Sequence, residues 1–174
     1  MSLQKITLPA FLITDWYANH LVLPETSNKQ TIITKKQVDS QSNEWYLGNN
    51  LQHIVILVNS ADAVYLPDEQ LQFLSAILTA CNKNMGDVAI VNLHQQPLLY
   101  AALKEKLQPT YLICFDVNAQ DIQLSFSIPH YQLQAYDNCK FLFAKGLDKM
   151  LGAGDIVKTE KRNLWEALKK MFSL

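Results

Sequence analysis

Three short runs of consecutive apolar residues constrain the fold of this chain more than any other feature. They occupy residues 54–58, 88–91 and 111–115, and the first, IVILV, is rich in β-branched side chains. Because neighbouring side chains of a strand point to opposite faces, a strand that is apolar throughout must be covered on both faces. The runs therefore predict three central, adjacent and mutually parallel strands.

Helical patterns separate these runs. One helix is predicted to begin at Pro67, with Asp68 and Glu69 in its first turn, where acidic side chains complement the helix dipole. A second is predicted over residues 97–107. The order strand, helix, strand, helix, strand favours parallel strands joined by right-handed crossovers. The fold class that we expect is α/β, a three-layer α/β/α domain with a mainly parallel central sheet.

The end of the chain has a different pattern. Residues 131–136 alternate polar and apolar, Asp137 and Asn138 form a turn signal, and residues 141–143 are apolar, which predicts a hairpin at the sheet margin. A last helix is expected to start after Thr159 as its N-cap. Its predicted apolar stripe is Leu164, Trp165, Leu168, Met171 and Phe172.

The first part of the chain is predicted to lie apart from this domain. Residues 1–44 read as an N-terminal arm followed by an irregular polar segment, and residues 45–174 as the α/β domain. Apolar residues of the arm are candidates for binding a protein partner through one face of a short helix. They are Leu8, Phe11, Leu12 and Trp16. The alternative is that the arm folds back and covers a sheet edge.

Composition limits the classes of partner. Hydrophobic residues make up 49% and charged residues 18% of the 174 residues, and the net charge is −1. Arg162 is the only arginine, although arginine is the residue best suited to bidentate contacts with bases and phosphates. We expect weak or no direct binding of nucleic acid.

The cysteines and the hydropathy pattern suggest the compartment. Cys81, Cys114 and Cys139 are odd in number, lie in apolar stretches and fit no zinc spacing, so buried thiols in a reducing compartment are predicted. The N-terminal segment lacks the pattern of a signal peptide, and no apolar run approaches the length of a membrane span. These features predict a cytoplasmic protein without a membrane partner.

Polar residues follow each predicted strand, at the sheet edge where α/β proteins bind ligands. These pocket candidates are Asn59, Asp62, Asn92, Asp116, Gln120 and Lys145. Asp62, Asn92 and Lys145 are the candidates for catalysis if the chain is an enzyme. Because the same residue types dominate ordinary turns, a purely structural role is the alternative.

Motifs for cofactors and metals are missing from the sequence. There is no GxGxxG, GxxxxGK[ST], GxSxG or HExxH. No cofactor and no metal site are expected.

Several segments resemble the uracil-DNA glycosylase fold over roughly residues 51–150. VAIVN ends a buried strand in Asn92, the predicted helix leads to Pro109, and YLICFDVNAQ ends in Ala119-Gln120, similar to the family's small-residue-plus-Gln step. The segment NSADAVY lacks the glycine-rich turn of the family's first motif. Asp62 occupies a position similar to that of the family's water-activating residue, without the turn around it. FLFAKGLDKM offers Lys145 where the family has a histidine. The resemblance thus implies the fold with a degenerate catalytic site.

The layout also resembles the psi subunit of bacterial DNA polymerase III. The segments that carry this likeness are FLITDW, HIVILVN, ILTACNKNMGDVAIVNL and NLWEALKKMF. The resemblance implies a non-catalytic adaptor of DNA replication or repair, whose arm binds a clamp loader and whose globular face binds another subunit. The alternative hypothesis is a small hydrolase or nucleobase-processing enzyme that uses the polar crevice at the strand ends.

Overall fold

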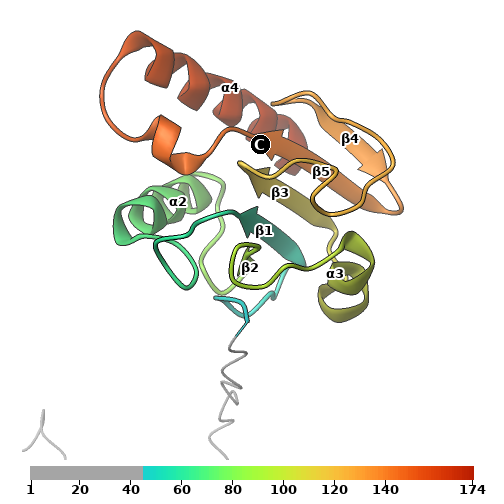
Figure 1. The fold of residues 1–174 in the computed structure, drawn as a ribbon. Helices are drawn as coiled ribbons and strands as arrows, with labels where there is room; N and C mark the ends of the chain where they lie inside the picture. The colour runs from blue at the N-terminus through green and yellow to red at the C-terminus, as the bar shows by residue number, and fades with distance from the viewer. Residues whose placement is uncertain (1–44) are drawn as a thin grey trace, which may run out of the picture. The chain divides into compact units, whose positions relative to one another are not determined.

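The computed structural model describes residues 45–174, which form an α/β fold with a mixed five-stranded sheet and three helices (Figure 1). Among these residues no helix is long and apolar enough to cross a membrane. The four arm candidates lie outside the described residues. In chain order the elements are β1 (Ile54–Val58), α2 (Asp68–Ala80), β2 (Val88–Asn92), α3 (Tyr100–Leu107), β3 (Tyr111–Phe115), β4 (Leu133–Tyr136), β5 (Cys139–Ala144), the 3₁₀ helix η1 (Leu147–Met150) and α4 (Asp155–Phe172).

The strand order in the sheet is β2-β1-β3-β5-β4. β1 pairs in parallel with β2 and with β3, which confirms that the three apolar runs are adjacent and parallel. β2 is not central, however, because the crossover through α2 leads outward and α3 then returns the chain to the other side of β1. β2 forms one margin of the five-stranded sheet, where Leu47 makes an isolated antiparallel bridge to Ile90.

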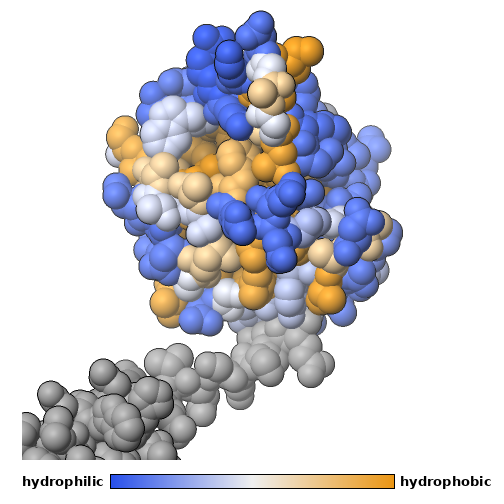
Figure 2. All heavy atoms as spheres, turned by 90° about the vertical axis from the view of Figure 1, so that its left-hand side faces the viewer, coloured by the Kyte–Doolittle hydropathy of each residue, from blue (hydrophilic) through white to orange (hydrophobic). Residues whose placement is uncertain are grey.

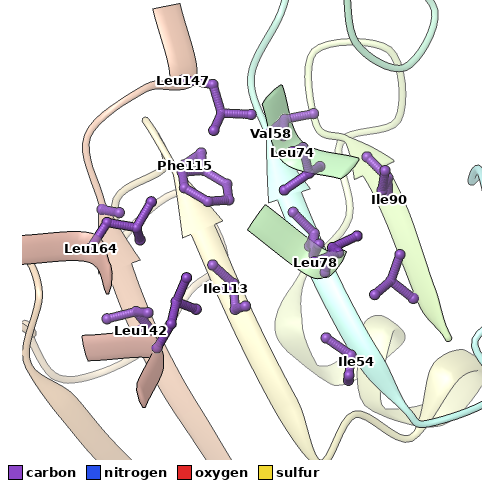
Figure 3. Packing of buried hydrophobic residues seen from close by; sticks show 14 of the residues in the cluster. Ile54, Val58, Leu74, Leu78, Ile90, Ile113, Phe115, Leu142, Leu147 and Leu164 are labelled. Atoms are coloured by element: carbon purple, nitrogen blue, oxygen red, sulfur yellow. The ribbon is translucent and has the colours of Figure 1, made fainter. Parts of the chain in front are cut away.

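Both faces of the sheet are covered, as continuous apolar strands require. On one face Ile54, Ile56 and Val58 pack with apolar side chains of α2 and α4 (Figure 3). On the other face Val55 and Leu57 pack with α3 and with the loop between β3 and β4. All five residues of β1 are buried, so this strand is the centre of two hydrophobic clusters.

The predicted hairpin is present, with a different place for its second strand. Asp137 and Asn138 both have positive φ angles, 55° and 60°, as a two-residue type I′ turn requires. β4 lies at the margin (Figure 1), but β5 lies inside the sheet because it also pairs in parallel with β3. Both faces of the apolar run 141–143 are also buried, because Leu142 packs in one hydrophobic cluster and Phe141 and Phe143 pack in the other.

Two helix starts differ from the prediction. α3 begins at Tyr100, three residues after Pro97, and α4 begins at Asp155, before Thr159. The hydroxyl of Thr159 donates to the Asp155 carbonyl oxygen over 2.9 Å inside the helix, so it cannot cap the N-terminus. Gly154 occupies the N-cap position instead, which a search for Ser, Thr, Asp or Asn overlooks.

The three cysteines are buried and free, as predicted. Burial raises the pKa of the Cys114 thiol well above its ordinary value, and it also raises that of Cys139 to about 12. A thiol with a raised pKa is poorly reactive because the thiolate is the nucleophile. These side chains therefore serve the core and not the chemistry of a site.

The central position of β1 leads to a stability prediction. We expect Ile56→Asp to lower the free energy of unfolding by about 4 kcal/mol or more, because it places an unpaired carboxylate in the core. The control is Ile156→Asp, since the Ile156 side chain is 77% exposed. Urea denaturation of the parent and both variants measures the effect. Equal midpoints for all three proteins would contradict the burial of β1.

Candidate functional site

A polar cavity lies at the carboxyl ends of β1, β3 and β5. Its volume is about 230 Å³. Four consecutive residues after β1 form one wall, and residues that follow β3 and β5 form the other, so three separate segments build it. The lining consists of Val58, Asn59, Ser60, Ala61, Asp62, Leu66, Gln70, Phe115, Asp116, Gly146, Leu147 and Asp148.

The structure divides the six predicted pocket residues between several places. Asn59, Asp62 and Asp116 line this cavity together. Gln120 lines a second cavity of about 380 Å³, bounded by residues 117–120 and 124–128 with His130 and Phe143. Asn92 and Lys145 line neither of the two cavities. Of the six predicted residues, only those that follow β1 and β3 therefore lie together at the carboxyl ends of the strands.

Asn92 ends β2, and its side chain is 1% exposed. Its amide nitrogen donates to the carbonyl oxygens of Ser60, Ala63 and Val64 over 2.7, 2.9 and 3.3 Å. Its amide oxygen accepts hydrogen bonds from the backbone N–H groups of Ser60 and His94 over 3.0 and 3.1 Å. These five bonds use the hydrogen-bonding capacity of the amide fully. Asn92 therefore fixes the loop that walls the cavity and has no group left for a substrate.

Lys145 follows β5 and belongs to a second polar network. Its Nζ lies 2.6 Å from Oε1 of Glu160 on α4, and the Tyr131 hydroxyl donates to Oε2 of the same carboxylate over 2.5 Å. Glu160 is only 8% exposed. The hydrogen bonds from Lys145 and Tyr131 lower its pKa, and burial with the bond to Glu160 raises the pKa of Tyr131. A buried carboxylate needs such partners, so Lys145 ties α4 to the sheet.

Asp116 follows β3, and its carboxylate forms an ion pair with Lys149. Its φ angle is 54°, in the left-handed region, and its Oδ1 lies 3.0 Å from Lys149 Nζ. The hydrogen bond to Asp116 raises the pKa of Lys149. Both side chains of this pair are about half exposed, so the ion pair contributes little to stability and can open at small cost.

Gly146 shapes the opposite wall. A Cβ atom at this position would lie 2.2 Å from Oδ1 of Asp148, a distance that real Cβ atoms do not show. The absence of a side chain therefore allows the Asp148 carboxylate to approach the backbone. Within residues 45–174 no three His, Cys, Asp or Glu side chains are placed to hold a metal ion. The three aspartates of the lining thus form an acidic rim without metal-site geometry.

Sequence reasoning missed four residues of these arrangements: Gln70, Tyr131, Asp148 and Glu160. One of them had a usable signal. Glu160 lies one helical turn before Leu164, so it is an acidic residue on the apolar stripe of α4. An acid at such a position needs a buried partner. Gln70 and Asp148 are ordinary surface residue types in their segments, with no such signal.

Neither a protein-family model nor a curated protein sequence matches this chain. The interpretation of the cavity thus rests on its own geometry. That geometry offers carboxylates, amide groups and a hydroxyl around a small polar space, and Lys149 pairs with one of these carboxylates, that of Asp116.

The Asn92 network leads to a second prediction. We expect Asn92→Ala to cost about 3 kcal/mol of unfolding free energy, because it leaves buried backbone groups without partners. Asn59→Ala is the matched control, since this exposed neighbour of β1 lines the cavity without such a network. Urea denaturation gives the stability, and amide hydrogen exchange at Ser60 reports the loosening of the loop. Protection at Ser60 that survives in Asn92→Ala would contradict the role of this side chain.

Proposed function

We propose that this chain is a non-catalytic protein-interaction module of bacterial DNA replication or repair. In this proposal the domain has a degenerate uracil-DNA glycosylase-like fold and acts as a DNA polymerase III psi subunit does. It works in the cytoplasm without a cofactor, and a protein of the clamp-loader type is its expected partner.

One observation carries this proposal. Two of the three side chains that an enzyme would use at the strand ends are committed to the architecture. Asn92 is saturated by backbone groups, and Lys145 is paired with the buried Glu160 on α4. A general acid or base must reach the proton that it transfers, and neither side chain lines the cavity.

The surface of the domain is consistent with binding to a protein. Val64 and Ile156 are exposed by 65% and 77%, although both are large apolar residues. Figure 2 shows apolar side chains gathered within one face of the domain, surrounded by hydrophilic ones. Apolar side chains rimmed by polar ones are frequent where proteins bind other proteins.

A hydrolase or nucleobase-processing enzyme is the second candidate. The observation in its favour is that Asp62 and Asp116 share one concave site with Ser60. Its weakness is that neither Lys145 nor Lys149 is free to stabilise negative charge that develops on a substrate. Lys145 pairs with Glu160 of α4, and Lys149 pairs with Asp116, both half exposed.

The proposal predicts no uracil excision from single-stranded or double-stranded DNA. A general base such as Asp62 alone contributes roughly 10²–10⁴-fold, far less than the rate enhancement that enzymes provide for slow reactions. Oligonucleotides containing one uracil, incubated with the full chain and separated after alkaline cleavage, measure the activity. The control is the Asp62→Asn variant. Strand cleavage by the parent chain that disappears in this variant would make the enzyme candidate correct.

The arm provides the direct test of the adaptor function. We expect the immobilised full chain to capture a clamp-loader component, and the chain without residues 1–20 to lose it. The melting temperature should stay nearly the same, since docking residues do not stabilise the domain. The double substitution Leu12→Ala with Trp16→Ala is the finer variant, and Lys5→Ala is its control. Capture that yields no replication or repair protein would refute the function, and a large fall in melting temperature would refute the docking role of the arm.

A further inference from the structure

The two edge strands of the sheet, β2 and β4, differ in how far their outer backbone groups are hydrogen-bonded. At β2, the backbone of Leu47 exchanges two hydrogen bonds with Ile90, over 2.9 and 2.8 Å, which occupies part of that edge. At the other margin β4 pairs only with β5 in the described part of the chain (Figure 1). Exposed edge strands are usually short, as the four-residue β4 is, and many also carry lysine, proline or a bulge that prevents pairing with other chains. β4 reads LQAY and has neither a charge nor a proline.

The register of the hairpin shows which backbone groups face outward. In β5 the residues that bond towards β3 are the even-numbered ones. The Lys140 N–H donates to the Thr110 carbonyl, and the Ala144 carbonyl accepts from the Asp116 N–H. The odd-numbered residues of β5 therefore bond towards β4, because the groups of successive residues point to opposite sides of a strand.

Cys139 and Phe141 are opposite Tyr136 and Gln134. Tyr136 and Gln134 thus bond inward, and the N–H and carbonyl groups of Leu133 and Ala135 face the open edge. A side-chain contact agrees with this assignment, since Gln134 Nε2 donates to the Ala135 carbonyl oxygen over 3.3 Å. Two donors and two acceptors are thus presented at strand spacing, with only one weak internal partner.

The second cavity lies beside this edge. Its lining includes His130, three residues before β4 begins, and Phe126, whose ring packs edge-on against Tyr136 of β4 at 4.9 Å between centroids. Val117, Leu124 and Phe143 supply a buried apolar part. The remaining residues are Asn118, Ala119, Gln120, Ser125, Ser127 and Ile128.

The chemistry of this lining selects the occupant. Among the described residues this lining contains no carboxylate, lysine or arginine, so a cation entering the cavity would lose its hydration without gaining a counter-charge, and an anion would meet only the imidazole of His130. A volume of about 380 Å³ lined by apolar, amide and hydroxyl groups suits one bulky uncharged side chain. The open edge next to it requires an extended backbone, because only that presents complementary donors and acceptors at the same spacing.

We propose that β4 binds an extended peptide segment of a partner protein as an added strand, with one bulky apolar side chain of that segment in the cavity beside it. This inference rests on the proposed function, since it gives the interaction module a second binding surface and the chemistry of its partner. A second copy of the chain fits less well. Leu133 of β4 packs against the core of its own domain, and Tyr136, although 48% exposed, packs its ring against Phe126. A copy paired through β4 would have to give up these contacts to place either side chain in the cavity.

The test uses the full chain and a phage library of random linear peptides. We expect the selected peptides to share an uncharged stretch with one bulky apolar residue. A fluorescent copy of the best peptide then gives the dissociation constant by polarisation. Ala135→Pro should weaken binding by about tenfold or more, because it removes an outward donor and leaves the β4–β5 bonds in place. Ala135→Thr, which keeps the N–H group, is the matched control and should bind like the parent. Ser127→Trp should weaken binding by filling the cavity.

Four outcomes would overturn the inference. Selection of charged peptides, or of none, contradicts the chemistry of the cavity, and equal binding by Ala135→Pro and Ala135→Thr contradicts the strand pairing. Slow amide exchange of Leu133 and Ala135 in the free full chain would show that the edge is already occupied. A mass by light scattering that rises with concentration in the parent but not in Ala135→Pro would assign the edge to a second copy.

If Ala135→Pro loses the peptide but still captures a clamp-loader component, both proposals stand at separate surfaces. If peptide binding fails while that capture persists, only the edge inference falls.

Discussion

The pairing of β1 between two parallel neighbours is the constraint on which the rest of the domain depends. Every residue of this strand is apolar and buried, and its backbone is paired on both sides. Helices must then cover both faces, and each crossover must return the chain to the same end of the sheet. The carboxyl ends of the parallel strands meet at one edge in consequence, and the loops after β1, β3 and β5 enclose the polar cavity.

Several polar side chains near that edge form hydrogen bonds that hold loops and helices of the domain in place. Asn92 satisfies the backbone of a loop that has no regular structure of its own, and Glu160 holds Lys145 and Tyr131 where α4 meets the sheet. Removing a partner from either network leaves a buried group unsatisfied, so the cost of losing the contact exceeds its net contribution. Asn92 and Lys145 are thus committed to the architecture, whereas the carboxylates that line the cavity, Asp62 and Asp116 among them, belong to neither network.

The sequence predicted where the strands lie along the chain better than it predicted their order in the sheet. The apolar runs located β1, β2 and β3 because burial on both faces leaves a local pattern. The marginal place of β2 has no such pattern, since it depends on the direction of the crossover. In the site, Asn59, Asp62 and Asp116 line one cavity, because each of them follows a parallel strand of the sheet. The partners of Asn92 in the loop after β1 lie 28 to 32 residues away along the chain, and the partner of Lys145 lies 15 residues away, so nothing local specifies these contacts.

The long connection between β3 and β4 joins the open edge and the second cavity into one unit. It leaves β3 at the carboxyl end, covers the face that α3 shares, and returns to start β4 at the margin. Phe126 of this connection packs on Tyr136 and Phe141, so the cavity wall and the edge strand are held by the same aromatic contacts. A strand added at β4 would therefore meet a cavity whose position is fixed relative to the edge. The lining of the strand-end cavity shares no residue with the lining of this one, so a ligand there and a peptide at β4 would occupy separate parts of the surface.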